Sequence, residues 1–300
     1  MAESRRSSTG LALVAILVGV AVLIAFAYSV VRWYRDQTDY VDSSSGPGCL
    51  ATVDGEEATL TLEQSPNAAI IAGTSVGRWL APRAASIGLT TAFQESGIRN
   101  IDYGDRDSVG LFQQRPSQGW GTVEEIMDPH YATNAFYNVM VTIPGWESAD
   151  LGDIAQEVQR SGFPDAYDKH VSTARLLASA LVGQTPAALS CVTDETPEPD
   201  PQTLINQIGW TYSSRAVLTD TVLPDEASGS TATILRYETD AEATAWSVAA
   251  FAQSWVCLGV TKVEVGGAVW SHASGSYAPW DLGDGTSEVP ATTIAITVGA

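Results

Sequence analysis

The residues PRAASIGLTTAFQESG at 82–97 predict a helix that is buried on nearly all sides. Pro82 suits the first turn of a helix, and Gly97 stands where many helices end in a left-handed residue. Before the last turn only Arg83 is charged, so the helix has almost no water-facing positions. Glu95 is therefore the unusual residue of this segment, because its carboxyl group closes an otherwise apolar helix.

A carboxyl group that is withdrawn from water has a raised pKa and can stay protonated near neutral pH. If Glu95 has this property, it can donate a proton to the oxygen of a glycosidic bond as that bond breaks. The alternative is a glutamate at a helix end whose side chain reaches solvent and has no chemical role. The helix pattern by itself leaves both interpretations open.

The neighbouring segments predict a mainly helical domain over residues 49–191. Asp128 precedes Pro129, which is the arrangement of an N-cap and a first helical residue. Apolar residues at helical spacing, with proline or glycine at the ends, favour several helices. They are expected over 62–80, over 82–96, from 129 onward, over 151–161 and over 165–182. Residues 97–125 are rich in glycine and aspartate and lie between helices, so we expect the site there.

Three short motifs follow one another in this domain. Glu95-Ser96 ends the buried helix, Gly110-Leu111-Phe112-Gln113 lies in the following loop, and Val158-Gln159 lies on a later helix. In this order they resemble motifs of the lysozyme-like superfamily, in particular of soluble lytic transglycosylases and goose-type lysozymes. Tyr103-Gly104-Asp105-Arg106 also resembles a stretch of the goose-type enzymes. Residues 94–120 as a block are similar to exported actinobacterial members of the superfamily.

The resemblance covers about residues 62–183 and implies an enzyme that cuts peptidoglycan glycan strands at the MurNAc–GlcNAc bond. One essential glutamate, here Glu95, acts first as acid and then as base. In lytic transglycosylases the base step activates the sugar's own 6-hydroxyl group and gives a 1,6-anhydro product, whereas in goose-type enzymes an aspartate positions water. Asp105 matches one such aspartate, the other falls on Arg115, and Val158 replaces the tyrosine of the third motif. We therefore expect a lytic transglycosylase, with a lysozyme-type hydrolase as the alternative.

Other side chains of the motifs and of their loop are candidates for binding the glycan. The amides of Gln113 and Gln114 can hydrogen-bond N-acetyl groups, and Trp120 can stack on a sugar face. The competing roles are a solvated loop pair for the glutamines, turn capping for Asp105 and Asp107, and a lid over the core for the tryptophan. The expected substrate-binding residues are Ser96, Asp105, Gln113, Gln114, Trp120 and Gln159.

An uncharged apolar segment at 11–31 precedes the domain and is long enough to cross a bilayer. We expect a transmembrane anchor, with residues 1–10 in the cytoplasm, residues 32–48 as a polar stalk and the bulk of the chain outside. Ala25-Phe26-Ala27 leaves a cleavable signal peptide open as the alternative. Both interpretations export the helical domain, which is then held at the cell membrane or secreted.

The chain changes character after the helical domain. Residues 192–202 are acidic, carry prolines at alternate positions and predict a semi-rigid linker that decouples two domains mechanically. Residues 203–300 predict a small domain with one helix on an antiparallel sheet, so the whole chain is expected to be α+β. The clearest signals of this second domain are strand patterns at 231–239 and 291–298, a hairpin around Gly266-Gly267 and a helix capped by Asp240. We expect it to position the enzyme, with an envelope protein as a possible partner.

The chain has three cysteines, Cys49, Cys191 and Cys257. Cys49 and Cys191 lie at the two ends of the helical domain, so a bond between them would stabilise it by about 4–5 kcal/mol in the loop-entropy model. Three cysteines allow three pairings, and the spacing does not choose between them. Our hypothesis is a Cys49–Cys191 disulfide, with Cys257 buried as a small apolar group.

The formal net charge of −20 argues against nucleic acid as a partner, because no basic stripe is present to replace the counterions of phosphates. The three histidines are scattered, without cysteine or histidine at ligand spacing, so we expect no metal and no cofactor. The rival from another class is a non-catalytic envelope protein that binds glycan or scaffolds a secretion or conjugation system.

Overall fold

A computed structural model of the chain describes residues 46–161, 164–224 and 231–299. The expected cytoplasmic tail at 1–10 and the expected anchor at 11–31 lie outside the described residues, as does most of the stalk. Within the described ranges, no helix is both long enough and apolar enough to cross a membrane. Residues Ser45–Ala300 belong to one compact unit.

Six α-helices form the helical region among the described residues, and five of them lie within the predicted segments. The six are α2 (Gln64–Gly77), α3 (Arg83–Ser96), α4 (Val123–Ile126), α5 (Pro129–Met140), α6 (Leu151–Gln159) and α7 (Val171–Leu181). The short helix α4 was not predicted, and the helix expected over 165–182 begins only at Val171, after two 3-10 turns. Helix α3 ends at Gly97, whose φ of 65° is left-handed, and the Asp128 carboxylate caps α5 by accepting from the backbone of His130 and Tyr131. Helix α3 packs against α2, α6 and α7, which explains why its sequence is apolar on nearly all sides.

A three-stranded antiparallel sheet, which the sequence did not predict, joins the two ends of the helical region. Its strands are β1 (Gly48–Val53), β2 (Glu56–Leu60) and β3 (Leu189–Val192), in the order β2-β1-β3. Cys49 and Cys191 face each other in the β1–β3 register and form a disulfide, so the predicted pairing is confirmed. The burial expected for Cys257 is wrong: it is a free, exposed cysteine in the 3-10 turn Val256–Leu258, which follows helix α9 (Glu242–Ser254).

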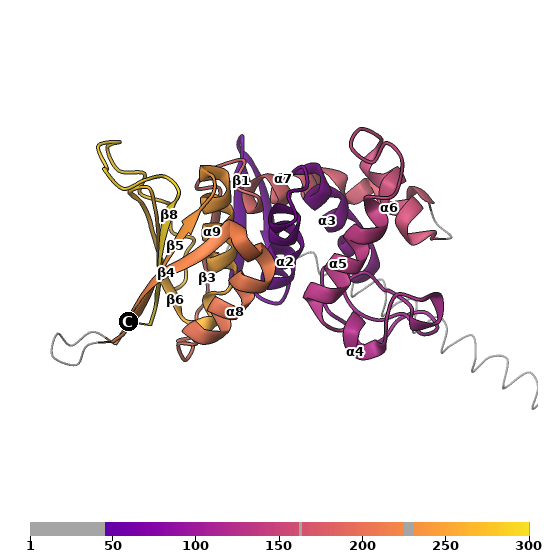
Figure 1. Cartoon of the computed structure of the whole chain (residues 1–300), viewed down its shortest axis with the longest axis horizontal. Coiled ribbons are helices and arrows are strands. Elements are labelled where there is room, and N and C mark those ends of the chain that lie inside the picture. Colours follow the sequence, from indigo (N-terminus) through magenta and orange to yellow (C-terminus); the bar gives the residue numbers. More distant parts are fainter. Residues whose placement is uncertain (1–45, 162–163, 225–230, 300) are drawn as a thin grey trace, which may run out of the picture. The chain divides into compact units, whose positions relative to one another are not determined.

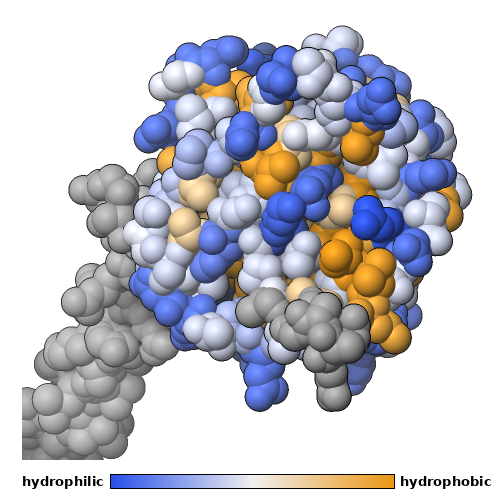
Figure 2. Space-filling view, turned by 90° about the vertical axis from the view of Figure 1, so that its left-hand side faces the viewer, coloured by the Kyte–Doolittle hydropathy of each residue, from blue (hydrophilic) through white to orange (hydrophobic). Residues whose placement is uncertain are grey.

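The C-terminal region is built on a five-stranded antiparallel sheet in the order β4-β5-β8-β6-β7. Its elements are α8 (Pro201–Tyr212), β4 (Ala216–Val222), β5 (Thr233–Thr239), α9 (Glu242–Ser254), β6 (Val260–Val265), β7 (Ala268–Ser271) and β8 (Thr293–Val298). The predicted α+β class is confirmed, and the turn between β6 and β7 has both glycines, Gly266 and Gly267, at positive φ. Figure 2 shows the side that carries this sheet, where apolar side chains lie in separate groups among hydrophilic ones.

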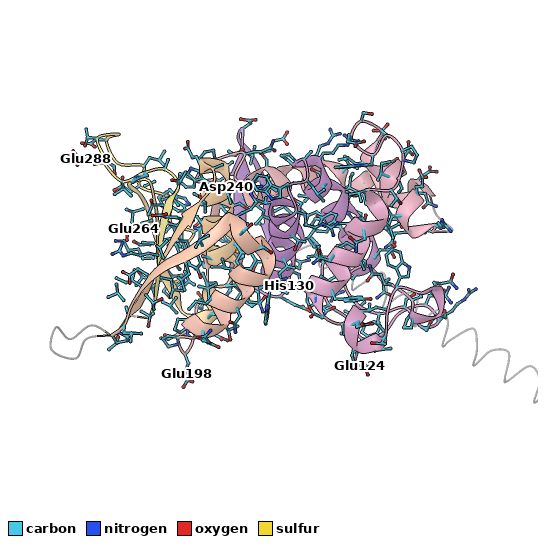
Figure 3. All side chains as sticks on the ribbon, viewed as in Figure 1. Glu124, His130, Glu198, Asp240, Glu264 and Glu288 are labelled. Atoms are coloured by element: carbon cyan, nitrogen blue, oxygen red, sulfur yellow. A yellow bond between two sulfur atoms is a disulfide. The ribbon has the colours of Figure 1, made fainter. Side chains whose placement is uncertain are left out.

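Two details of the predicted C-terminal domain are wrong. The region contains a second helix, α8, whose first turn begins at Pro201 inside the segment expected to be linker. Proline suits a first helical turn, and the Asp200 carboxylate caps the helix by accepting from the backbone N–H of Thr203. Asp240 does not cap α9, because its carboxylate accepts instead from Nε of Arg215 at 2.9 Å; the side chain is labelled in Figure 3.

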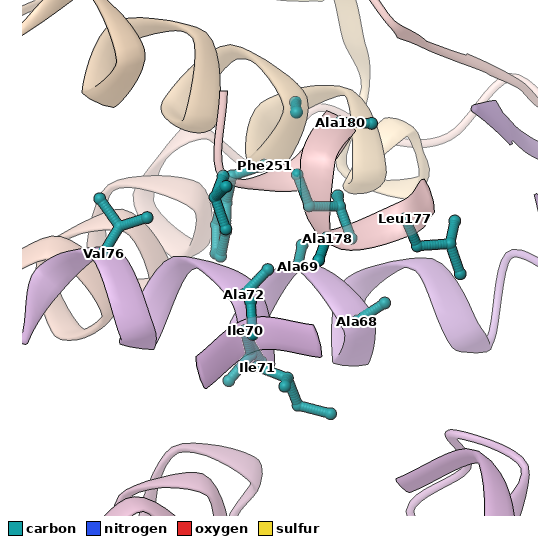
Figure 4. Packing of buried hydrophobic residues seen from close by; sticks show 14 of the residues in the cluster. Ala68, Ala69, Ile70, Ile71, Ala72, Val76, Leu177, Ala178, Ala180 and Phe251 are labelled. Carbon is teal, nitrogen blue, oxygen red and sulfur yellow. The ribbon is translucent and has the colours of Figure 1, made fainter. Parts of the chain in front are cut away.

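The helical region and the C-terminal region share one hydrophobic core. Helices α2 and α9 pack against each other and lie between the five-stranded sheet and the other helices of the helical region (Figure 1). Figure 4 shows Phe251 of α9 over α2, near Val76 and Ala72. Buried hydroxyl groups add polar contacts across the same boundary: Oγ of Ser65 donates to the carbonyl of Ser254 at 3.1 Å. The segment at 192–202 therefore does not keep the two regions mechanically separate.

Candidate active site

Glu95 lies in the last turn of α3, where the helix leaves the core. The rest of this helix is buried among α2, α6 and α7, so the carboxyl group is half-buried and loses most of its hydration. Burial raises the pKa of Glu95 to about 7. At this pKa a substantial fraction of the Glu95 carboxyl groups is protonated at neutral pH.

Tyr167 is the partner of this carboxyl group. It lies between two short 3-10 turns, Pro164–Ala166 and Asp168–His170, immediately before α7. Its side chain is fully buried, and its hydroxyl donates a hydrogen bond of 2.5 Å to Oε1 of Glu95. This bond lowers the pKa of Glu95 and so opposes the effect of burial. Burial and the nearby carboxylate raise the pKa of Tyr167 above its usual range, so the phenol stays a donor.

Sequence reasoning missed Tyr167. The residue falls inside the segment expected to be helical at 165–182 and belongs to none of the recognised motifs. The third motif is predicted at Val158-Gln159, where valine stands in place of the tyrosine of the families that the motifs resemble. A tyrosine nine residues later on a different element reaches the acid instead, and nothing in the local pattern indicates that contact.

The other motif residues join the end of α3 to the loop at 110–113. Oγ of Ser96 donates to the carbonyl of Leu111 at 2.7 Å, and Nε2 of Gln159 donates to the carbonyl of Phe112 at 2.6 Å. Ser96 is 7% exposed and is further used as an acceptor for the backbone N–H of Arg99. Both side chains, which were predicted to bind substrate, thus hold successive backbone carbonyls of the loop.

The two glutamines of the loop differ in their surroundings. Gln113 is half-buried and adopts a left-handed backbone with φ of 48°, and its Nε2 donates to the carbonyls of Tyr103 and Gly110 at 3.2 and 3.3 Å. Gln114 is 1% exposed and donates to the carbonyl of Ala132 on α5 at 3.1 Å. Gln113 is therefore the one of the pair that lies near the surface, while Gln114 supports the packing of α5.

The two aspartates of the loop, Asp105 and Asp107, also differ in their surroundings. Asp105 has 91% of its side chain exposed, and its carboxylate lies 3.8 Å from Nε of Arg106. Asp107 accepts hydrogen bonds from Nε of Arg115 at 2.8 Å and from the backbone and hydroxyl of Ser117 at 2.8 and 3.0 Å. These bonds hold the pKa of Asp107 well below its usual range. Asp107 thus closes the loop, as turn capping would predict.

Trp120 is half-buried and packs against the hydrophobic core. Its carbonyl accepts a hydrogen bond from the Tyr131 hydroxyl at 3.2 Å, which ties the loop to α5. The contact with the core fits the predicted role of a lid, and stacking on a sugar stays a prediction.

The three histidines have different surroundings: Nε2 of His130 hydrogen-bonds Oε1 of Gln207, Nε2 of His272 accepts from the backbone N–H of Thr193, and His170 packs against α3. His170 is half-buried and stacks on Phe93 of α3 with ring centroids 5.5 Å apart. Burial lowers the pKa of His170 to about 4, so the ring is neutral at neutral pH. Among the residues that the structure describes, no group of three or more histidine, cysteine or acidic side chains is placed to hold a metal ion.

Comparison of the chain with models of protein families gives no match, and comparison with curated proteins gives none.

Proposed function

We propose that this protein cleaves the glycan strands of peptidoglycan at the MurNAc–GlcNAc bond by a lytic transglycosylase-like mechanism with Glu95 as its acid and base. The observation that carries the proposal is the half-buried Glu95 carboxyl group, with a pKa of about 7 and a hydrogen bond from a buried tyrosine. General acids work best when their pKa lies near the working pH. The substrate class is inferred from the resemblance of Glu95-Ser96, followed by the loop motif at 110–113, to motifs of enzymes that cleave peptidoglycan glycan strands.

In this mechanism Glu95 gives its proton to the glycosidic oxygen while the bond from that oxygen to C1 of MurNAc breaks. The GlcNAc part leaves with a hydroxyl group. The resulting carboxylate then takes the proton of the MurNAc 6-hydroxyl group, whose oxygen forms the new bond to C1. The product carries a 1,6-anhydro end, and Glu95 is protonated again, so no water is consumed.

Two features of the loop favour this route over hydrolysis. Hydrolysis in goose-type enzymes relies on aspartates that position water. Asp105, the residue that matches one of them, is exposed and pairs with Arg106. Arg115 occupies the position of the other and forms an ion pair with Asp107. A lysozyme-type hydrolase acting on the same bond is the alternative.

The proposed location follows from the N-terminal segment. We propose that residues 11–31 anchor the chain in the cell membrane and that the compact unit lies outside the cytoplasm, where peptidoglycan is found. The disulfide between Cys49 and Cys191 supports this proposal, since disulfides persist in oxidising compartments. The C-terminal region remains a candidate for contact with an envelope protein.

Digestion of purified peptidoglycan, followed by mass spectrometry of the products, tests the reaction. The expected products of the full chain carry anhydro ends, which are one water lighter than the reducing ends of a hydrolase. Glu95→Gln is expected to lower the rate at least about a hundredfold, the scale of general acid–base catalysis. The matched control is Glu124→Gln, because Glu124 is an exposed glutamate on α4 (Figure 3).

Each result bears on one alternative. Reducing ends in place of anhydro ends would identify the hydrolase. A Glu95→Gln variant with turnover within a few-fold of the parent would contradict the assigned role of Glu95. An inactive parent chain that still binds glycan would support the non-catalytic envelope protein.

A further inference from the structure

A pocket of about 490 Å³ opens at the N-terminal end of α3. Arg83 and Ser86 of α3 line it on one side, and Arg175 and Ser179 of α7 line it on the other. The remaining lining residues are Ala81, Pro82, Leu151 and Gln184. None of these residues is acidic, although the chain as a whole carries a formal net charge of −20. The pocket is therefore a local concentration of positive charge on an acidic protein.

The two arginines of this pocket have no carboxylate partner. In the part of the chain that the structure describes, neither Arg83 nor Arg175 forms an ion pair. Nε of Arg83 donates to the carbonyl of Trp146 at 2.9 Å, which fixes the side chain, while its Nη2 is buried and has no hydrogen-bond partner among the described residues. The Arg83 guanidinium is therefore held in the wall of the pocket, and no carboxylate of the described residues lies at ion-pair distance to compensate its charge.

We propose that this pocket binds a phosphate group. Two guanidinium groups supply two positive charges, and the hydroxyl groups of Ser86 and Ser179 can donate hydrogen bonds beside them. A phosphate monoester carries a charge of about −1.5 to −2 at neutral pH, which matches this sum better than a carboxylate does. Its oxygens can also accept hydrogen bonds from both guanidinium groups at once.

The neighbouring pocket shows that this charge pattern is local. It shares Arg175 and Ser179 with the phosphate pocket, but Asp54 and Glu56 line it as well. Phosphate should therefore prefer the pocket at α3, where no carboxylate repels it. Arg83 and Glu95 lie at opposite ends of α3, about 18 Å apart along the helix axis, so the phosphate site does not depend on the proposed glycan cleavage.

Isothermal titration calorimetry of the purified full chain, at pH 7.5 and constant ionic strength, tests the site. The probe is inorganic phosphate, with an expected Kd of about 1 mM or tighter. Arg175→Gln is the first variant because the side chain is exposed and its replacement leaves the core intact. We expect the variant to bind at least about tenfold more weakly, since it loses charge-assisted hydrogen bonds. Arg83→Gln should weaken binding similarly, with thermal unfolding as a check on its fold.

Arg236→Gln is the matched control, because Arg236 lies on β5 and its guanidinium is 3.9 Å from Asp220. It should bind phosphate like the parent. A second titration with glycerol 3-phosphate distinguishes the sources: tighter binding than inorganic phosphate indicates a phosphate carried on a larger molecule, and equal binding indicates the free ion. The proposal is overturned if the parent shows no saturable binding, if Arg175→Gln binds like the parent, or if acetate binds as tightly as phosphate.

Discussion

At the scale of single residues, two opposing effects set the pKa of the Glu95 carboxyl group. Burial at the end of α3 favours the neutral acid, while the hydrogen bond from the Tyr167 hydroxyl favours the carboxylate. Burial is the larger effect, and the result is a pKa of about 7. In the proposed mechanism Glu95 must start protonated, so the rate of glycan cleavage should fall as the pH rises through this value.

Tyr167→Phe should move that limb of the pH–rate profile to higher pH. The variant loses the donor that stabilises the carboxylate while burial remains, so the pKa of Glu95 rises by about one unit, the scale of one hydrogen bond. The measurement is kcat/KM against pH between about 5 and 9. Tyr131→Phe is the control, because that hydroxyl donates to the carbonyl of Trp120 instead. A limb that stays in place or moves to lower pH would show that Tyr167 does not tune the acid.

At the scale of elements, hydrogen bonds to the backbone carbonyls of Leu111 and Phe112 fix the loop between the end of α3 and the end of α6. The donors, Ser96 and Gln159, come from motifs that the sequence linked to substrate. The geometry gives them a positioning role, because they hold the loop that carries Gln113 next to the helix that carries Glu95.

Strands β1 and β3 join the two ends of the helical region, and the Cys49–Cys191 disulfide links these strands. Removing the bond should lower the stability of the folded chain. Replacing Cys49 and Cys191 together by alanine should lower the free energy of unfolding by about 4 kcal/mol, because the bond closes a long loop in the unfolded chain. Chemical denaturation monitored by circular dichroism measures this change. Cys257→Ala is the control and should change stability by less than about 0.5 kcal/mol, since the residue is exposed. A double variant as stable as the parent would show that the three-stranded sheet suffices without the bond.

At the scale of the whole molecule, α2 belongs to two regions at once. One face packs against α3 and α5, and another packs against α8 and α9 of the C-terminal region. Gly73 and Gly77 allow this close approach: a β-carbon on Gly77 would lie 2.2 Å from the carbonyl oxygen of Thr211. The C-terminal region therefore supports α2, the helix on which α3 rests.

This architecture predicts that a fragment of residues 46–193 does not fold like the full chain. Without α8 and α9, the apolar face of α2 is exposed to water, and the hydrophobic burial that supports it is lost. We expect aggregation or a fragment without cooperative unfolding, measured by size-exclusion chromatography and by near-ultraviolet circular dichroism.

The matched control for this truncation is a fragment of residues 46–300, which keeps the whole described core and should unfold cooperatively. If the shorter fragment also unfolds cooperatively and cleaves soluble glycan at the parent's rate, the shared core does not limit folding, and the helical region is an independent domain.

The features that the sequence determined by itself are local. The apolar run with Pro82 and Gly97 at its ends defines α3, Asp128 before Pro129 starts α5, and the two glycines at 266 and 267 mark the turn between β6 and β7. Each of these signals acts over a few residues through backbone preference, capping or side-chain periodicity. Glu95 could be proposed as the acid for the same reason, since an acidic residue at the end of an apolar helix is visible in the sequence of that helix.

Contacts between distant parts of the chain were decided only by the tertiary structure. The bond from Tyr167 to Glu95 joins residues 72 positions apart, and the contact of Ser65 with Ser254 joins residues 189 positions apart. The same holds for β3, which is recognisable only beside β1, and for the core that unites the two predicted domains. Periodicity describes which face of an element is apolar, but it does not specify which distant element covers that face, because the choice depends on how all faces are buried together.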